Sequence, residues 1–131
     1  MRKDISIPKV EDVHVVAVLE FNKEHNTNDW NVYIINDRQE AIEMVLILSR
    51  GYGKNQETSQ MRHKLQVLPA QSFAKIEFLE DSVLKLNNEF LVTFFADNQL
   101  MEKTYVFKAN NVKENNVTAI PVMKDKGILA E

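Results

Sequence analysis

The sequence predicts an all-β protein, folded as an antiparallel β-sandwich of about seven strands. Short apolar runs rich in Val, Ile, Phe and Tyr recur along the chain, and polar loops separate them. No long stretch has the periodicity of an amphipathic helix. The densest part is residues 30–52, where two apolar runs flank a polar break at residues 36–40. These three observations together define the fold class.

The first two strands that we expect span residues 13–21 and 30–35. In residues 13–21 the odd positions share one face, while Val16 and Val18 lie on the other, so the middle of this strand should be covered on both sides. Residues 30–35 alternate, which places Trp30, Val32 and Ile34 on one face.

The third strand, residues 44–48, is apolar at every position, which indicates a central strand covered on both faces. We therefore expect Leu46 and Ile47 to point into two different covered layers. Two exposed loops bracket the neighbouring segments, at residues 22–29 and 53–59, because both are polar and rich in turn-forming residues.

Two further strands are expected at residues 61–67 and 73–79, separated by Pro69, which cannot donate to a central ladder. Alternation predicts the inward residues of both strands and assigns Lys75 and Glu77 to the outside. The residues expected to point inward are Met61, His63, Leu65, Val67, Ala74, Ile76 and Phe78.

Residues 90–96 and 101–107 are predicted to form a β-hairpin around residues 97–99, because Asp and Asn favour tight turns. One face of this hairpin should be buried, and it carries Phe90, Val92, Phe94, Met101, Tyr105 and Phe107.

The chain divides into three parts by this pattern. Residues 1–11 are expected to be a leader or an edge strand, and residues 12–110 form the sandwich domain. Residues 111–131 are a C-terminal segment whose apolar residues are too many for a solvated tail, while Pro121 and Gly127 interrupt any central strand. We expect this segment to dock, either on its own sandwich or on a second molecule.

Composition restricts the classes of partner. The 131 residues have a net charge of −3 and contain no cysteine. This balance disfavours a nucleic-acid or anionic-membrane partner, and the absence of disulfides is typical of a reducing compartment. The first residues lack the apolar core of a signal peptide, and no apolar run reaches the ~20 residues of a membrane helix. We expect a cytoplasmic protein.

The segment VLPAQS at 67–72, followed by an alternating strand, resembles the Leu-Pro-x-x-Ser turn common in bacterial immunoglobulin-like domains. More widely, WNVY (30–33), SRGYG (49–53), LPAQS (68–72) and IPV (120–122) are similar to a family of small, uncharacterised bacterial proteins. This resemblance implies an immunoglobulin-like sandwich. Some family members are labelled phenylalanyl-tRNA synthetase alpha subunit, but this chain has neither the length nor the ATP-binding motifs of a class II synthetase.

Five residues are the candidates for binding: Arg50, Tyr52, Lys54, Arg62 and Lys64. Arg62 and Lys64 share the outer side of one strand, and the other three lie just upstream. Together they could form a basic patch for an acidic partner, with Tyr52 exposed beside it. The alternative is a solvated strand face whose charges discourage edge pairing.

No catalytic, metal or cofactor site is predicted. The three histidines have neither HxH nor HExxH spacing, no calcium-loop or GxSxG pattern occurs, and Gly51-Tyr52-Gly53-Lys54 lacks the spacing of a phosphate-binding loop. We therefore expect a non-enzymatic protein-interaction module that could self-associate. The alternative is a sandwich that binds a small molecule or a carbohydrate. A deep cleft with convergent polar groups would favour the second function.

Overall fold

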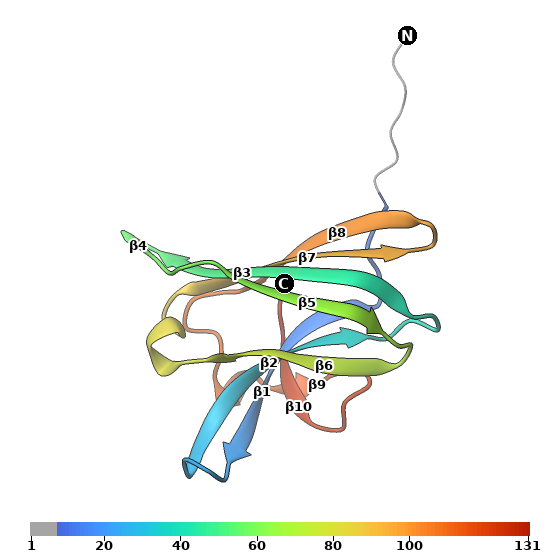
Figure 1. Cartoon of the computed structure of the whole chain (residues 1–131). Helices are drawn as coiled ribbons and strands as arrows, with labels where there is room; N and C mark the ends of the chain where they lie inside the picture. Colours follow the sequence, from blue (N-terminus) through green and yellow to red (C-terminus); the bar gives the residue numbers. More distant parts are fainter. Residues whose placement is uncertain (1–7) are drawn as a thin grey trace.

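The computed structural model describes residues 8–131 and shows two antiparallel sheets packed face to face (Figure 1). The predicted all-β fold is confirmed. Seven strands are long: β1 (Val13–Asn22), β2 (Thr27–Asn36), β3 (Ile42–Gly53), β5 (Met61–Leu68), β6 (Ser72–Leu79), β7 (Asn87–Ala96) and β8 (Gln99–Phe107).

Three strands are short: β4 (Gln56–Glu57), β9 (Thr118–Ala119) and β10 (Lys126–Leu129). The helical content of the described part consists of two single 3₁₀ turns, η1 (Asp81–Val83) and η2 (Glu114–Asn116). Of the predicted leader, residues 1–7 lie outside the described residues, and residues 8–11 form no strand, although Val10 is buried in the core.

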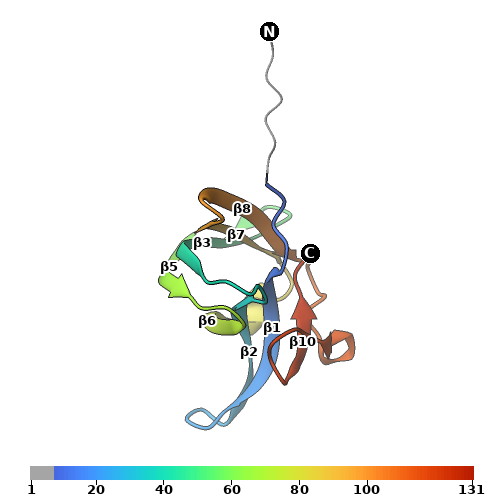
Figure 2. The ribbon, with the colours of Figure 1, turned by 90° about the vertical axis from the view of Figure 1, so that its right-hand side faces the viewer.

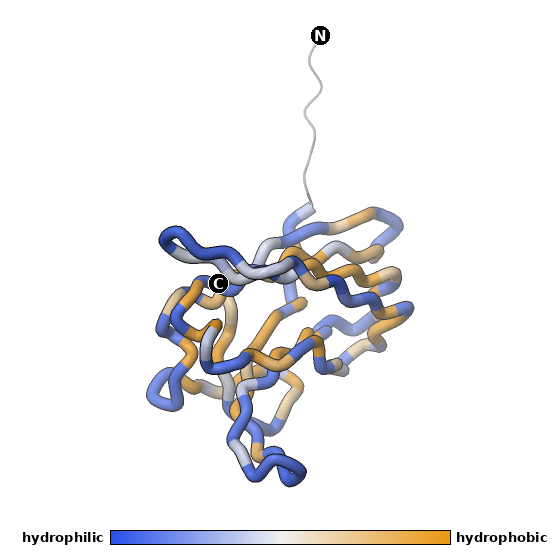
Figure 3. The backbone as a smooth tube through the Cα atoms, turned by 60° about the vertical axis from the view of Figure 1, so that its left-hand side comes forward, coloured by the Kyte–Doolittle hydropathy of each residue, from blue (hydrophilic) through white to orange (hydrophobic). Residues whose placement is uncertain are grey.

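The first sheet has the strand order β6-β2-β1-β10-β9, and the second has β5-β3-β7-β8 with β4 also on β3 (Figure 2). The core between them is built from the inward residues of both sheets, including Val15, Ile34, Ile47 and Phe90. Along the chain, strand centres are hydrophobic and the connecting loops hydrophilic (Figure 3). Each sheet has an apolar face toward the other sheet and a more polar face toward solvent. Burial of the apolar faces is therefore the main contribution to the stability of the fold.

The β7–β8 hairpin turns at Asp97 and Asn98, and the prediction for it is confirmed. Both turn residues have positive φ (55° and 62°). This backbone suits the type I′ turn, whose twist matches that of the flanking strands, and Asp and Asn tolerate it better than other non-glycine residues. All six side chains assigned to the buried face of the hairpin are buried.

The C-terminal segment lies against its own sandwich. β10 pairs with β1 through Val16↔Leu129 and Ala17↔Ile128, so the first sheet continues past residue 110, the end of the sandwich domain predicted from sequence. The residues before β10 cross the outside of the first sheet. There Ile120 and Met123 pack on Val16, Val18 and Ile35, which form a second apolar cluster. The expected two-sided burial of β1 is thus provided by the C-terminal segment.

Alternation fails at two places, each next to an irregularity of the ladder. In β6, Val32 pairs with Glu77 and Tyr33 with Lys75, so Ile76 is an extra residue and the strand bulges. A bulge moves every later side chain to the opposite face. Glu77 therefore faces the other sheet and Phe78 faces solvent, the reverse of our prediction.

The second failure lies where β3 shifts register against β7, between Glu43 and Leu46. Met44 adopts φ 51° here. Val67 on the neighbouring strand β5 pairs with Glu43 of β3. Its side chain is exposed, although alternation predicts that it points inward. Leu46 also departs from the prediction, because it is half-buried on the solvent side while Ile47 is fully buried.

Candidate functional site

Arg50 and Tyr52, two of the predicted binding residues, lie next to each other on β3. The Arg50 guanidinium carbon is 4.9 Å from the centroid of the Tyr52 ring. Arg50 Nε lies 2.9 Å from Glu89 Oε2 and Arg50 Nη1 lies 2.8 Å from Glu57 Oε1. Hydrogen bonds to Glu89 and then Glu57 raise the pKa of Arg50. Two carboxylates therefore already balance this charge.

The other three predicted residues are separate from that pair. Lys54 is exposed in the turn between β3 and β4. Arg62 and Lys64 are exposed on β5, where they pair across the ladder with Leu48 and Leu46. The five residues therefore share one sheet but do not converge on one pocket.

The solvent-facing side of the β5-β3-β7-β8 sheet, here called the outer face, carries an apolar stripe. Its members are Leu46 and Leu48 on β3 and Leu91 and Phe95 on β7. Leu48 pairs directly with Leu91, while Phe95 pairs with Leu100 on β8. None of the four side chains belongs to either core cluster found in residues 8–131. Leu46, Leu48 and Leu91 are half-buried and Phe95 is exposed, so the outer stripe is partly accessible apolar surface outside the core of residues 8–131.

Charges of opposite sign border the outer stripe on its two sides. One cross-strand row runs Lys64, Leu46, Thr93, Glu102, and the next runs Arg62, Leu48, Leu91, Thr104. The β5 edge is therefore basic and the β8 edge carries a carboxylate. Both edges are exposed.

Met44 extends the outer stripe at the irregularity of β3. Its side chain is 69 % exposed, and it shares a depression of about 300 Å³ with Leu46 and Lys64. A non-glycine residue at positive φ lowers the stability of the folded state by of order 1 kcal/mol or more. An exposed methionine side chain contributes little burial to offset that strain. Strained backbone positions of this kind cluster at functional sites.

A cleft of about 850 Å³ opens between β5 and β6, which belong to different sheets. Three polar side chains meet in it. Ser49 Oγ donates to Glu77 Oε1 at 2.6 Å, and His63 Nε2 lies 2.8 Å from the same oxygen. The remaining lining is mixed. Apolar residues, among them Met61, Ile76 and Phe90, alternate with polar ones, among them Arg50, Glu80 and Asn88.

Sequence reasoning missed this cleft because it assigned Glu77 to the outside. The bulge at Ile76 is what turns the carboxylate toward Ser49 on β3 and His63 on β5. A run such as Ala-Lys-Ile-Glu-Phe shows regular alternation, and nothing in it marks the extra residue. The pairing with β2 is needed to detect it.

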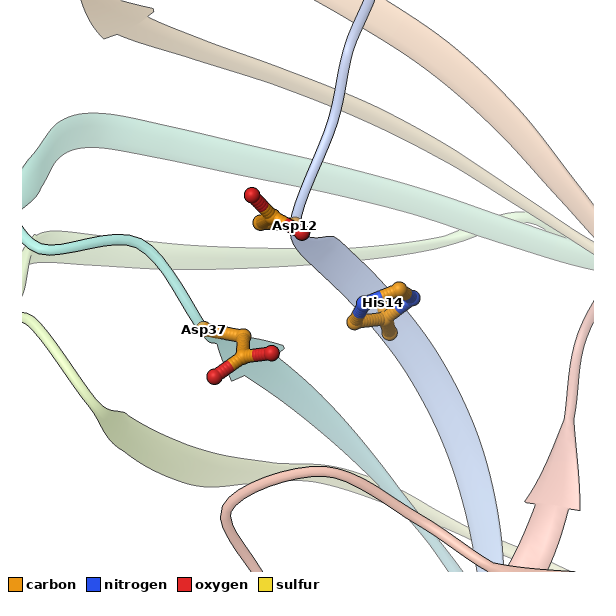
Figure 4. A group of neighbouring side chains, drawn as sticks. All are labelled: Asp12, His14 and Asp37. Carbon is orange, nitrogen blue, oxygen red and sulfur yellow. The ribbon is translucent and has the colours of Figure 1, made fainter.

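A third group of polar side chains lies at the end of the β1–β2 ladder: Asp12, His14 and Asp37 (Figure 4). One possible ligand atom from each lies within 4.8 Å of the other two. Burial of the His14 ring lowers its pKa, against the opposing effects of Asp37 and Asp12; Lys103 adds to the lowering. The imidazole is therefore neutral at neutral pH. Residues 12 and 37 are far apart in sequence, so spacing alone could not group them.

No family model, curated protein or solved structure matches this chain. Within residues 8–131, no helix has the length and apolar character required to cross a lipid bilayer. The three sites are therefore interpreted from their own geometry.

Proposed function

We propose that this protein is a non-enzymatic interaction module that self-associates through the outer face of its second sheet. The observation that carries the proposal is the outer stripe, bordered by Arg62 and Lys64 on one edge and by Glu102 on the other. Contiguous exposed apolar surface with a polar rim is characteristic of protein interfaces.

The arrangement is complementary to itself. A two-fold axis that lies in the interface parallel to the strands places β5 of one copy opposite β8 of the other. Lys64 of one copy then faces Glu102 of the other, twice per dimer, and the two stripes meet at the centre. Two sheets packed in this way repeat the face-to-face packing found inside the sandwich.

Sedimentation velocity over a range of protein concentrations tests the proposal. We expect a reversible dimer for the native chain and a monomer for Phe95→Glu, which places a charge in the stripe. Phe21→Glu is the matched control, because Phe21 is also exposed but lies near the far end of β1 in the other sheet. A native chain that stays monomeric at millimolar concentration, or equal effects of both substitutions, would contradict it.

Charge reversal tests the orientation of the two copies. Lys64→Glu and Glu102→Lys each place like charges opposite each other and should weaken the dimer, more strongly at low salt. The double variant restores opposite charges and should recover the native dimer constant. If the double variant dimerises more weakly than both single variants, the two-fold arrangement described above is wrong.

A ligand-binding role is the second candidate, and the cleft between β5 and β6 favours it. Its volume of about 850 Å³ lies within the usual range for small-molecule sites, and Ser49, His63 and Glu77 converge in it. Titration of the protein with a panel of mono- and disaccharides tests this function, with binding measured from the NMR chemical shifts of the Ser49 and His63 amides. Shifts that saturate in the native chain and vanish in Glu77→Gln support it; no shift at millimolar sugar contradicts it.

We further propose an immunoglobulin-like fold, membership of the small bacterial family that the sequence resembles, and a cytoplasmic location. The strand order supports the first, because β6-β2-β1 facing β5-β3-β7-β8 corresponds to strands E-B-A facing C′-C-F-G. The absence of cysteine supports the location. The negative net charge and the two carboxylates on Arg50 support a protein partner rather than nucleic acid or a membrane.

A further inference from the structure

We infer that Asp12, His14 and Asp37 form a binding site for one divalent transition-metal ion of the zinc class. Asp12 is the residue before β1, His14 lies on β1, and Asp37 is the residue after β2 (Figure 4). This inference replaces the expectation from sequence that the protein has no metal site.

The β1–β2 ladder brings the ligands together. Val13 pairs with Asn36, and the Asp37 amide donates to the Asp12 carbonyl at 2.8 Å, so the two aspartates face each other one step beyond the last pair. Asp12 precedes β1 and has φ 61°, and one ligand atom from its side chain lies within 4.8 Å of those of His14 and Asp37. Asp12 and Asp37, at the two ends of the β1–β2 hairpin, are thus held in fixed register.

The spacing of the donor atoms suits a single ion after a small closure. Metal–ligand bonds of about 2.1 Å put two ligands roughly 3.4 Å apart in a tetrahedron and about 4.2 Å apart when they are opposite. The present separations are within 4.8 Å. Asp12 is exposed and can change rotamer to close the remaining gap.

The surroundings of Asp37 hold its carboxylate in place. Gln71 Nε2 donates to Asp37 Oδ1 at 3.1 Å and to the Asp37 carbonyl at 2.8 Å. This leaves Oδ2 as the atom for a metal, and an amide that orients a carboxylate ligand is a common second layer around metals. Lys103 is the positive charge acting on His14, and its ammonium lies 4.9 Å from the centroid of the Tyr105 ring.

The donor set selects the class of ion. Two carboxylates facing each other repel unless a cation lies between them, and oxygen ligands alone would suit Mg²⁺ or Ca²⁺. The imidazole nitrogen that His14 adds to the two carboxylates shifts the preference to Zn²⁺ and similar ions. Three protein ligands leave coordination positions open for water.

Calorimetric titration of the full chain with ZnCl₂ tests the site. We expect one Zn²⁺ per chain, bound more tightly than Mg²⁺ or Ca²⁺, with an affinity lowered at least about tenfold by His14→Gln and by Asp37→Asn. His25→Gln is the matched control, because His25 is exposed in the β1–β2 loop and should leave the affinity unchanged.

A second measurement guards against loss of structure in the variants. Mn²⁺ should broaden the amide signals of residues 12–14 and 37 selectively, and Asp12→Asn, an exposed substitution, should remove this broadening while the rest of the spectrum stays native. The inference is overturned if Zn²⁺ fails to bind at millimolar concentration. It is equally overturned if His25→Gln weakens binding as much as His14→Gln, or if Mg²⁺ and Zn²⁺ bind alike.

Discussion

Tyr105 shows how much one buried side chain contributes to the joining of the two sheets. It lies on β8 in the core, and its hydroxyl donates to the backbone carbonyl of Val13 on β1 in the opposite sheet. Burial raises the pKa of this phenol above its ordinary value of 10.0. The neutral form is therefore the one that the folded state requires.

Because the folded pKa is raised, the contribution of Tyr105 is fully present below pH 10 and is lost as the pH rises above it, when the unfolded chain ionises and the folded chain does not. Tyr105→Phe should cost about 1–3 kcal/mol at neutral pH, since it leaves the Val13 carbonyl without this partner. The difference in unfolding free energy should shrink above pH 10. Urea titrations at several pH values measure it; a difference that stays constant with pH would refute the assignment.

Leu46 and Ile47 are neighbours on β3 with opposite environments. Ile47 is fully buried between the sheets, whereas Leu46 lies on the outer face. Ile47→Ala should destabilise the chain by about 2–5 kcal/mol, because it leaves a cavity. Leu46→Ala should cost less than about 1 kcal/mol at a protein concentration too low for the proposed self-association. Equal losses for both in chemical denaturation would mean that the outer face is covered.

At the scale of the strand, the sequence predicts which segments are strands better than it predicts which way their side chains point. The β7–β8 hairpin and the inward positions of β2 follow from alternation and turn chemistry alone. Glu77, Phe78 and Val67 do not, because the bulge in β6 and the irregularity in β3 depend on the partner strand.

The same limit applies to the candidate sites. Arg62 and Lys64 lie on the outer side of their strand as alternation predicts, but the apolar stripe beside them requires the order β5-β3-β7-β8. Asp12 and Asp37 become neighbours only through the register of β1 with β2. Long-range pairing, rather than local preference, creates these sites.

The bulge in β6 should contribute to stability through Glu77. This carboxylate accepts a hydrogen bond from Ser49 and contacts His63, so it links the first sheet to two strands of the second. Glu77→Ala should cost about 1–3 kcal/mol, because the buried Ser49 hydroxyl loses its partner. Lys75→Ala, on the exposed side of the same strand, is the control. Thermal melts that place both variants at the native midpoint would show that the link is not stabilising.

Across the whole molecule, the two sides of the sandwich differ. On one side the C-terminal residues bridge the sheets, because the Ala130 amide donates to the Val15 carbonyl while Glu131 and Val106 exchange two backbone hydrogen bonds of 2.9 Å. On the other side β5 and β6 remain apart and the cleft opens. The side that lacks a bridging strand is therefore the side that can admit a ligand.

The C-terminal bridge should contribute to the stability of the fold. Removing residues 117–131 would uncover Val16, Val18 and Ile35 and expose the edge of β1. Burial of Ile120, Met123 and Ile128 contributes about 1.5–3 kcal/mol each before the cost of ordering the segment. The truncated chain should melt at a lower temperature and aggregate through the free edge.

A milder pair of substitutions separates packing from the loss of a strand. Ile128→Ala removes a side chain that is 9 % exposed in the core, whereas Leu129→Ala trims one that is 41 % exposed on the same strand. The first should cost about 2–4 kcal/mol and the second well under 1 kcal/mol, since only the first leaves a cavity. If Ile128→Ala and the truncation both leave the thermal midpoint unchanged, β10 is a passive tail. The two sheets would then be held together by the core of the seven long strands alone.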